Sequence, residues 1–222
     1  MATSDPVPPA VRAQLLATEH WSLLATRSQT WGEVMSRIMG QFTFTSASLV
    51  VLALVVQQDG VDGDAFRPLA LGLGAAVVLT GSLTTLRVLN ASMEDAMLVG
   101  GMNRLRRAYV ELDPGILPYL TAGTYDDRAG ISRTYTMGPQ RDVSQVLASA
   151  GTFSLFTTSL VSGCWVGLLA VPLGTPFAIL LGVLAGAAFA GAFLAGAYRS
   201  FRRHEDDPDT VRFPTPPADG EQ

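Results

Sequence analysis

Long apolar segments dominate the hydrophobic pattern of this chain. No charged residue occurs between Asp142 and Arg199, and within that interval Pro172 and Pro176 flank a short turn. Proline interrupts a helix because it lacks a backbone N–H, so the interval divides into two apolar segments. A helix needs about 20 apolar residues to cross the roughly 30 Å core of a bilayer. By that criterion the sequence predicts four membrane spans, at residues 38–56, 68–86, 146–171 and 177–198.

A further helix is predicted before the first span, over residues 10–36. Its stripe at three- and four-residue spacing combines apolar side chains with His20 and Arg27. A mixed stripe of this kind favours a helix at the membrane surface or against a partner helix.

The segment between the second and third spans, residues 87–145, is predicted to begin as a helical extension of the second span. Asp113-Pro114 ends that extension, and the following residues 114–140 read as a loop with no assigned regular fold. Residues 1–9 and 204–222 are rich in proline and acid, and we expect both chain ends to be disordered. The predicted fold is therefore an all-α membrane protein with four transmembrane helices in two hairpins, an amphipathic N-terminal helix and a cytoplasmic extension of the second span.

Arginine placement predicts the orientation of these spans. Every basic residue is arginine, and all arginines except Arg67 lie before the first span, between the second and third, or after the fourth. Short cytoplasmic loops retain positive charge, so both termini and the long central segment are predicted to face the cytoplasm. The expected location is a bacterial plasma membrane.

Composition argues against catalysis. The 222 residues are 48% hydrophobic and 15% charged, against about 25% charged in soluble domains. The absence of lysine excludes P-loop and Schiff-base chemistry, and the single Cys164 excludes an intrachain disulfide. With two histidines and no metal-binding or nucleophile motif, we expect neither an enzyme nor a cofactor or metal site.

Polar residues inside the spans are few and uncharged. Two interpretations remain open for them: hydrogen-bonded contacts between helices, which are common in membranes and are favoured, or the lining of a pore in an oligomer. The candidate residues are Gln41, Thr45, Ser48, Thr80, Thr84, Ser159 and Ser162.

The fourth span carries a pattern of small residues at four-residue steps. Gly182, Gly186 and Ala190 form one row, and Gly191 belongs to the row beside it. Small side chains let helix backbones approach closely, so this pattern predicts tight packing within the bundle or against another subunit.

The cytoplasmic segments offer residues for an interaction with a partner. The candidates are His20, Arg27, Arg104, Arg106 and Arg107, although acidic neighbours make an ordinary charged helix face the simpler interpretation of the last three. Asp126-Asp127 is interpreted as a solvated carboxylate pair. The expected partners are the lipid bilayer, a second copy of the chain and a cytoplasmic protein, and no nucleic acid is expected.

Two stretches carry a resemblance. EHWSLLATRS, from Glu19 to Ser28, and GMNRLRRAY, from Gly101 to Tyr109, resemble segments of a group of actinobacterial multipass membrane proteins with no known activity. The helical plan is also similar to the SLATT effector domains of bacterial conflict systems, which implies membrane pores. This second likeness lies in the architecture, without a shared motif.

Two functional hypotheses follow. The first is a non-catalytic membrane component that oligomerises or docks a partner. The second is an oligomeric ion channel or pore-forming effector lined by the hydroxyl-bearing faces of the spans.

Overall fold

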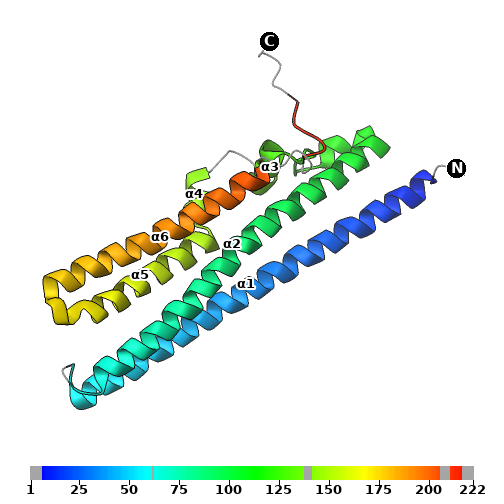
Figure 1. Ribbon diagram of the computed structural model, residues 1–222. Coiled ribbons are helices and arrows are strands. Elements are labelled where there is room, and N and C mark those ends of the chain that lie inside the picture. The colour runs from blue at the N-terminus through cyan, green and yellow to red at the C-terminus, as the bar shows by residue number, and fades with distance from the viewer. Residues whose placement is uncertain (1–6, 62, 138–141, 206–210, 217–222) are drawn as a thin grey trace, which may run out of the picture. The chain divides into compact units, whose positions relative to one another are not determined.

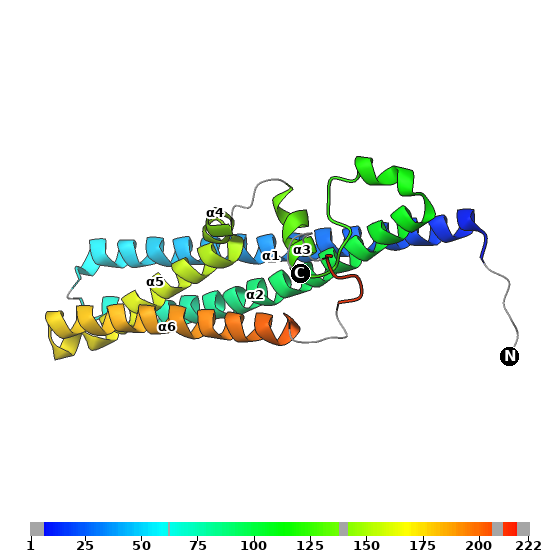
Figure 2. The same ribbon diagram turned by 90° about the horizontal axis from the view of Figure 1, so that it is seen from above.

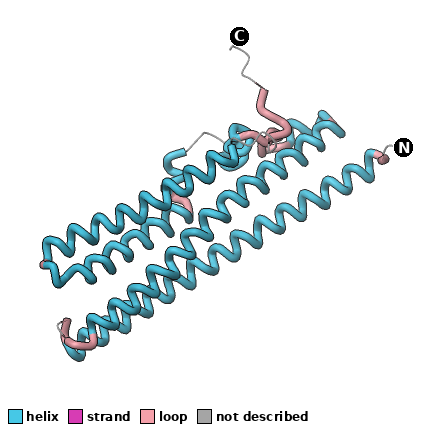
Figure 3. The backbone as a smooth tube through the Cα atoms, viewed as in Figure 1, coloured by secondary structure: helices cyan, strands magenta, loops and turns pink. Residues whose placement is uncertain are grey.

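The computed structural model describes residues 7–61, 63–137, 142–205 and 211–216. Within these ranges the regular structure is helical throughout, and no strand occurs (Figures 1 and 3). The elements are α1 (Pro9–Asp59), α2 (Phe66–Leu112), the 3-10 helix η1 (Pro114–Tyr119), α3 (Arg128–Thr136), α4 (Asp142–Leu147), α5 (Ala150–Ala170), the 3-10 helix η2 (Val171–Leu173) and α6 (Thr175–Glu205).

Four helices are long and apolar enough to cross a membrane: α1, α2, α5 with η2, and α6. This confirms the prediction of four hydrophobic helices. The helix expected over residues 10–36 and the first span are one continuous helix, α1, because no proline or glycine turn interrupts them. The α2 helix likewise runs from the second span to Leu112, where Asp113-Pro114 follows.

The third span begins later than the apolar pattern indicates. Helix α4 ends at Leu147, and α5 begins at Ala150. Ser149 separates the two helices by capping α5, since its Oγ accepts a hydrogen bond from the backbone N–H of Thr152 at 3.1 Å. Apolar periodicity alone does not reveal such a cap.

The chain divides into two compact units, which we name by their character. The polar unit comprises residues 1–31, 93–142 and 201–222, and the apolar unit comprises residues 32–92 and 143–200. Helices α1, α2 and α6 contribute residues to both units.

In the apolar unit, α5 and α6 run antiparallel and approach closely (Figures 1 and 2). A Cβ atom built on Gly163 would lie 2.8 Å from the carbonyl oxygen of Gly182, and one on Gly186 would lie 3.0 Å from that of Ser159. Only glycine permits this separation, because any side chain would push the two backbones apart.

Side chains also connect the other helices of the apolar unit. The Gln41 amide of α1 donates to the Val77 carbonyl of α2 at 3.1 Å, and the Trp165 indole of α5 donates to the Leu71 carbonyl of α2 at 2.9 Å. Phe42 and Phe153 place their ring centroids 5.2 Å apart. These contacts tie α1, α2 and α5 into one bundle.

The outer faces of the apolar unit are covered with large apolar side chains. In the most apolar stretch of α6 only 6% of the residues are buried, and Val183 is 66% exposed. Leu49 on α1 and Phe156 on α5 are exposed to a similar degree, at 62% and 67%. A water-soluble protein rarely exposes so much contiguous apolar surface, whereas lipid solvates it.

The segment predicted to be a loop, residues 114–140, contains two capped helices within its described part. Asp113 accepts from the Gly115 N–H at 2.9 Å to cap η1, and Asp127 accepts from the Gly130 N–H at 2.9 Å to cap α3. The periodic apolar pattern is too short here to predict either helix. Of the chain ends expected to be disordered, residues 1–6, 206–210 and 217–222 lie outside the described residues.

Candidate interaction site

A buried carboxylate, Asp95, stands at the centre of the polar unit. Its side chain is 3% exposed and accepts four hydrogen bonds from three residues. Arg27 donates through Nε at 2.6 Å and through its terminal nitrogen at 3.3 Å, the Trp31 indole donates at 2.8 Å, and the Tyr135 hydroxyl donates at 2.5 Å. Asp95 thereby joins α1, α2 and α3. We call these four residues the Asp95 hub.

The hub is electrostatically complete. Burial alone would raise the pKa of Asp95, but the hydrogen bonds from Arg27, Tyr135 and Trp31 outweigh it and hold the pKa below its ordinary value. Burial and the adjacent carboxylate raise the pKa of Tyr135, so its phenol stays protonated as a donor. A buried charge with all its partners in place fixes the geometry of the three helices.

A second buried network surrounds Asn103 on α2. Its amide donates to the Tyr125 carbonyl at 2.7 Å and to the Gly130 carbonyl at 3.2 Å, while the Thr134 hydroxyl lies 2.9 Å from its amide oxygen. The Thr134 hydroxyl also accepts from the Gly123 N–H at 3.0 Å. A Cβ on Gly130 would lie 2.2 Å from the backbone carbonyl oxygen of Tyr125, so this packing requires glycine. The network holds α3 and the preceding loop on α2.

The Asp126-Asp127 pair binds the C-terminal segment 211–216. The Asp126 carboxylate accepts from the backbone N–H groups of Arg212 and Phe213, at 2.9 and 2.8 Å, and from the Arg104 side chain at 2.6 Å. Asp127 accepts from the N–H and the hydroxyl of Thr215, at 2.8 and 2.7 Å. We call Asp126 and Asp127 the carboxylate clamp. Asp126 is 4% exposed, so the interpretation of a solvated pair is wrong.

The residues predicted to make cytoplasmic interactions lie in the polar unit, and most have internal partners. Arg27 belongs to the Asp95 hub and Arg104 holds the clamp. Arg106 donates to the Asn103 side-chain oxygen at 2.7 Å. Burial is the main cause that lowers the pKa of Arg106, and the positive charge of Arg27 lowers it further. The ring of His20 stacks on that of Tyr109, with centroids 6.0 Å apart.

Arg107 of the same predicted set is more open. Its guanidinium lies 5.8 Å from the Tyr125 ring centroid and 3.6 Å from a Glu111 carboxylate oxygen, and its side chain is 38% exposed. The contact with Glu111 is too long for a hydrogen bond, and the Arg107 Nε atom that makes it is buried with no hydrogen-bond partner among the described residues.

The residues predicted as a pore lining or as helix contacts donate mainly within their own helices. The hydroxyl groups each bond to the carbonyl four residues earlier, at 2.7 to 2.8 Å: Thr45, Ser48, Thr80, Thr84, Ser159 and Ser162. Gln41 instead bonds across to α2, as the helix-contact interpretation expects. A hydroxyl whose proton is held by its own helix needs no water, so the buried Ser48, Thr84, Ser159 and Ser162 fit a dry helix interface, whereas Thr80 is exposed.

An interhelical hydroxyl cluster lies beside this set. The Thr85 Oγ1 atom of α2 is 3.0 Å from the Ser154 hydroxyl and 3.2 Å from the Thr158 hydroxyl of α5, and all three residues are buried. Sequence reasoning missed these three residues because it selected the helix faces that contain Thr84 and Ser159.

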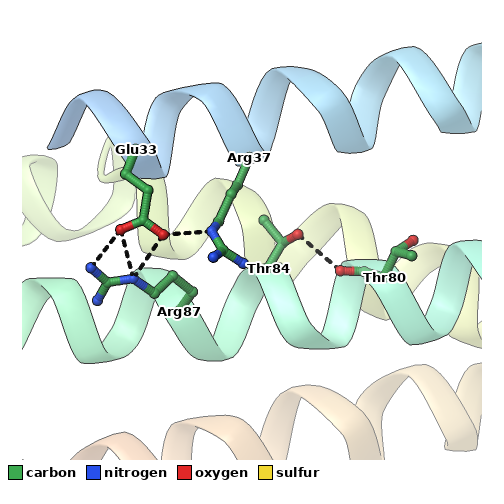
Figure 4. A network of polar contacts seen from close by, with 5 residues as sticks. All are labelled: Glu33, Arg37, Thr80, Thr84 and Arg87. Carbon is green, nitrogen blue, oxygen red and sulfur yellow. Dashed lines mark hydrogen bonds and ion pairs between the residues drawn. The ribbon is translucent and has the colours of Figure 1, made fainter. Parts of the chain in front are cut away.

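A charged network lies where α1 and α2 enter the apolar unit (Figure 4). The Glu33 carboxylate of α1 accepts from Arg37 at 2.7 Å on its own helix and from Arg87 of α2 at 2.9 Å. The hydrogen bonds from Arg87 and Arg37 hold the pKa of Glu33 below its ordinary value. Because Glu33 is exposed, this pairing aligns the two helices without adding much stability.

The small residues of α6 divide between two environments. Gly182 is buried against Gly163, and the half-buried Gly186 packs against Ser159. Ala190 is half-buried, whereas Gly191 is exposed and a Cβ there would meet nothing within 4 Å. Only part of the pattern therefore serves contacts within the chain.

A shallow open groove of about 380 Å³ lies between α1 and α2 within the polar unit. Leu23, Met97 and Leu98 supply most of its wall, with Glu94 as a carboxylate. Among the described residues no cluster of histidine, cysteine and carboxylate side chains is suited to hold a metal ion. The groove offers an apolar surface and no paired acid and base.

The residues that sequence reasoning missed carry one detectable signal. Asp95 lies in the same helical stripe as the buried Val88, Ala91, Val99 and Met102 of α2. A carboxylate within an otherwise apolar stripe predicts a buried, paired charge. Its partners Trp31 and Tyr135 have no comparable signal, because their distance along the chain hides the contact.

The fold defines a class: an all-helical chain with four helices long and apolar enough to span a bilayer. No family model, no curated protein and no solved structure matches this chain.

Proposed function

We propose that this chain is a multipass protein of the bacterial plasma membrane with a structural role, in which the four apolar helices anchor the polar unit and the polar unit assembles with a partner or a second copy. The exposed apolar faces of α1, α5 and α6 support the membrane location. Arginine placement supports two hairpins with both termini in the cytoplasm.

The internal pairing of polar groups is the observation that carries the structural role. In the apolar unit, the hydroxyl rows proposed as a lining bond to their own helices, and the Thr85 cluster bonds between helices. A conducting path needs polar groups that face water, whereas these groups are arranged for packing. This favours a structural protein over a channel.

Assembly is supported by apolar side chains on the outside of the polar unit. Trp21 is 72% exposed, Leu15 is 62% exposed and Leu24 is 42% exposed, all on α1 before the first predicted span. Exposed tryptophan is typical of surfaces that bind another protein, and the neighbouring leucines add apolar area around it.

Purification in mild detergent tests this role. We expect an assembly larger than one chain, or capture of a partner, and we expect Trp21→Ala to weaken it. Tyr119→Ala serves as the matched control, because Tyr119 is also an exposed aromatic residue, at 82%, but lies on η1. Ion flux through vesicles containing the purified protein would contradict the structural role and favour the channel hypothesis.

Thiol labelling tests the topology separately. Cys164→Ser removes the natural thiol, and single cysteines are then introduced by Asp64→Cys or Thr121→Cys. Position 64 lies between α1 and α2, position 121 lies between η1 and α3, and both are exposed. A membrane-impermeant maleimide added to whole cells should label only Asp64→Cys. Labelling of Thr121→Cys before permeabilisation would refute the cytoplasmic placement of the polar unit.

A further inference from the structure

The contacts of the C-terminal segment with the carboxylate clamp form a complete peptide-recognition pattern. Besides the side-chain acceptors, the Asp126 backbone N–H donates to the Phe213 carbonyl at 3.2 Å. Asp126 therefore binds the N–H of Phe213 through its carboxylate and the C=O of Phe213 through its own backbone N–H. Thr215 supplies a second pair of donors to Asp127.

The prolines of the segment limit its conformations. Phe213 and Thr215 each precede a proline, which restricts the backbone of both residues, and the chain bends at Arg212 and Phe213. A segment with few alternative conformations loses little entropy when it binds. Phe213 is half-buried in the complex, whereas Pro214 and Thr215 are exposed.

The clamp itself is held in place by the rest of the polar unit. The Arg104 Nε atom donates to the Asp126 carboxylate, and the Gly130 N–H at the start of α3 donates to the Asp127 carboxylate. These contacts orient both carboxylates before the segment arrives. The segment supplies four donors to the clamp, three backbone N–H groups and one hydroxyl, and in the fifth contact the Phe213 carbonyl accepts from the Asp126 N–H.

We infer that the carboxylate clamp is a binding site for a bent peptide that presents two successive backbone N–H groups to Asp126 and, two residues later, a hydroxyl-bearing residue, and that the segment 211–216 of a second copy occupies it when the chain's own segment leaves. A second copy is the ligand whose fit the structure displays, because it carries the identical segment. A tether to the same chain gives the internal segment a high effective concentration, on the order of millimolar for a short link. Exchange between copies therefore requires release of the internal segment.

This inference goes beyond the proposed function, since the site lies wholly in the polar unit and its peptide test needs no membrane topology. Its failure leaves the membrane role intact. A vesicle or detergent result against the membrane role likewise leaves the peptide test unchanged.

The test uses a fluorescent peptide covering residues 209–218 and the full chain with a protease site placed in residues 206–210. After folding in detergent, the chain is cleaved and washed, and peptide binding is followed by fluorescence anisotropy. We expect saturable binding to the cleaved chain that is at least tenfold tighter than to the uncleaved chain. Absence of saturable binding to a cleaved chain that keeps its circular dichroism spectrum would overturn the inference.

Altered peptides test the pattern without disturbing the protein. N-methylation of the Phe213 amide removes a donor to Asp126, and we expect binding about 10- to 100-fold weaker, as for a lost hydrogen bond to a charged group. Thr215→Val removes the hydroxyl donor to Asp127 and should also weaken binding. Affinities equal to that of the unmodified peptide would show that the clamp does not recognise the segment in this way.

Exchange between copies is tested with a tagged, cleaved chain mixed with an untagged chain. The untagged copy carries both Asp126→Asn and Asp127→Asn, which weaken the hold of its own clamp, and its C-terminal segment is left intact. We expect the tagged chain to retain this copy, and to retain less of a matched copy whose segment has been removed. Equal retention of both copies would overturn the exchange, even where the peptide binds.

Discussion

Replacing Tyr135 by phenylalanine removes a single oxygen atom from the Asp95 hub. The ring and its position near Arg27, whose guanidinium lies 5.8 Å from the ring centroid, are retained. What is lost is the 2.5 Å hydrogen bond from the phenol to a carboxylate that is 3% exposed. Asp95 keeps its bonds from Arg27 and Trp31, so its charge remains compensated.

The size of the effect follows from the type of bond. A hydrogen bond to a charged group contributes about 1.5–3 kcal/mol, and a short O–H donor to a carboxylate belongs to the stronger kind. Since about 1.4 kcal/mol corresponds to a factor of ten, Tyr135→Phe should favour opening of α3 from the polar unit by roughly 10- to 150-fold.

Trypsin cleavage measures this opening, because Arg128 and Arg133 lie on α3 itself. When closing is fast relative to cleavage, the cleavage rate reports the population of the open form. We expect faster cleavage of Tyr135→Phe in detergent at low protease concentration. Thr136→Val is the matched control, since the Thr136 hydroxyl bonds only within α3, to Ser132 at 3.1 Å and Arg133 at 3.5 Å, among the contacts described.

A double-mutant cycle with Asp95→Asn then isolates the contact. If the phenol acts through the carboxylate, Tyr135→Phe should have a smaller effect in the Asp95→Asn background than in the natural one. A cleavage rate of Tyr135→Phe within twofold of the natural chain would refute the assignment of Asp95 as the hub that holds α3.

The remaining predictions concern helix packing and pH. Gly182→Val should disrupt the α5–α6 interface, because a Cβ there would lie 2.8 Å from the Gly163 carbonyl oxygen. Gly191→Val is the control, since a Cβ there meets nothing within 4 Å. In detergent, the unfolding temperature of Gly182→Val should be lower than that of Gly191→Val. Trp165→Phe should lower the unfolding temperature by less than Gly182→Val, since it loses the bond to the Leu71 carbonyl but keeps most of the ring. Both pKa values of the carboxylate clamp are held below the ordinary value, by bonds that outweigh the opposing effect of burial. Docking of the C-terminal segment should therefore be complete above about pH 3.9 and be lost as the pH falls further. Proteolysis of the segment by an acid-stable protease at graded pH measures this loss. Release of the segment between pH 5 and 7 would contradict the prediction.

Local sequence determined the long helices. The four apolar stretches are predictable because lipid-facing helices need a continuous run of apolar residues, and each residue contributes to that signal independently. Pro172 and the residues after it mark the division of the third and fourth helices for the same local reason. The helix extension to Leu112 was also predictable, because Asp113-Pro114 ends it.

The candidate site was only partly predictable. The pattern around Gly182 and Gly186 indicates close packing, since small residues at four-residue steps lie on one helix face. It does not tell which glycine faces α5 and which faces outward. Arg27 and Arg104 were selected for their charge, but their partners Asp95 and Asp126 follow them by 68 and 22 positions.

What the sequence by itself determined about this protein is its class, all-helical with four apolar helices, because hydrophobic pattern and helix termination act over short stretches of chain. The tertiary structure alone decided which groups pair with Asp95, that the segment assigned no regular fold forms α3, and that residues 211–216 bind the carboxylate clamp. Each of these depends on groups brought together from distant parts of the chain. Their energies come from desolvation and from the geometry of hydrogen bonds, which exist only once the helices have packed.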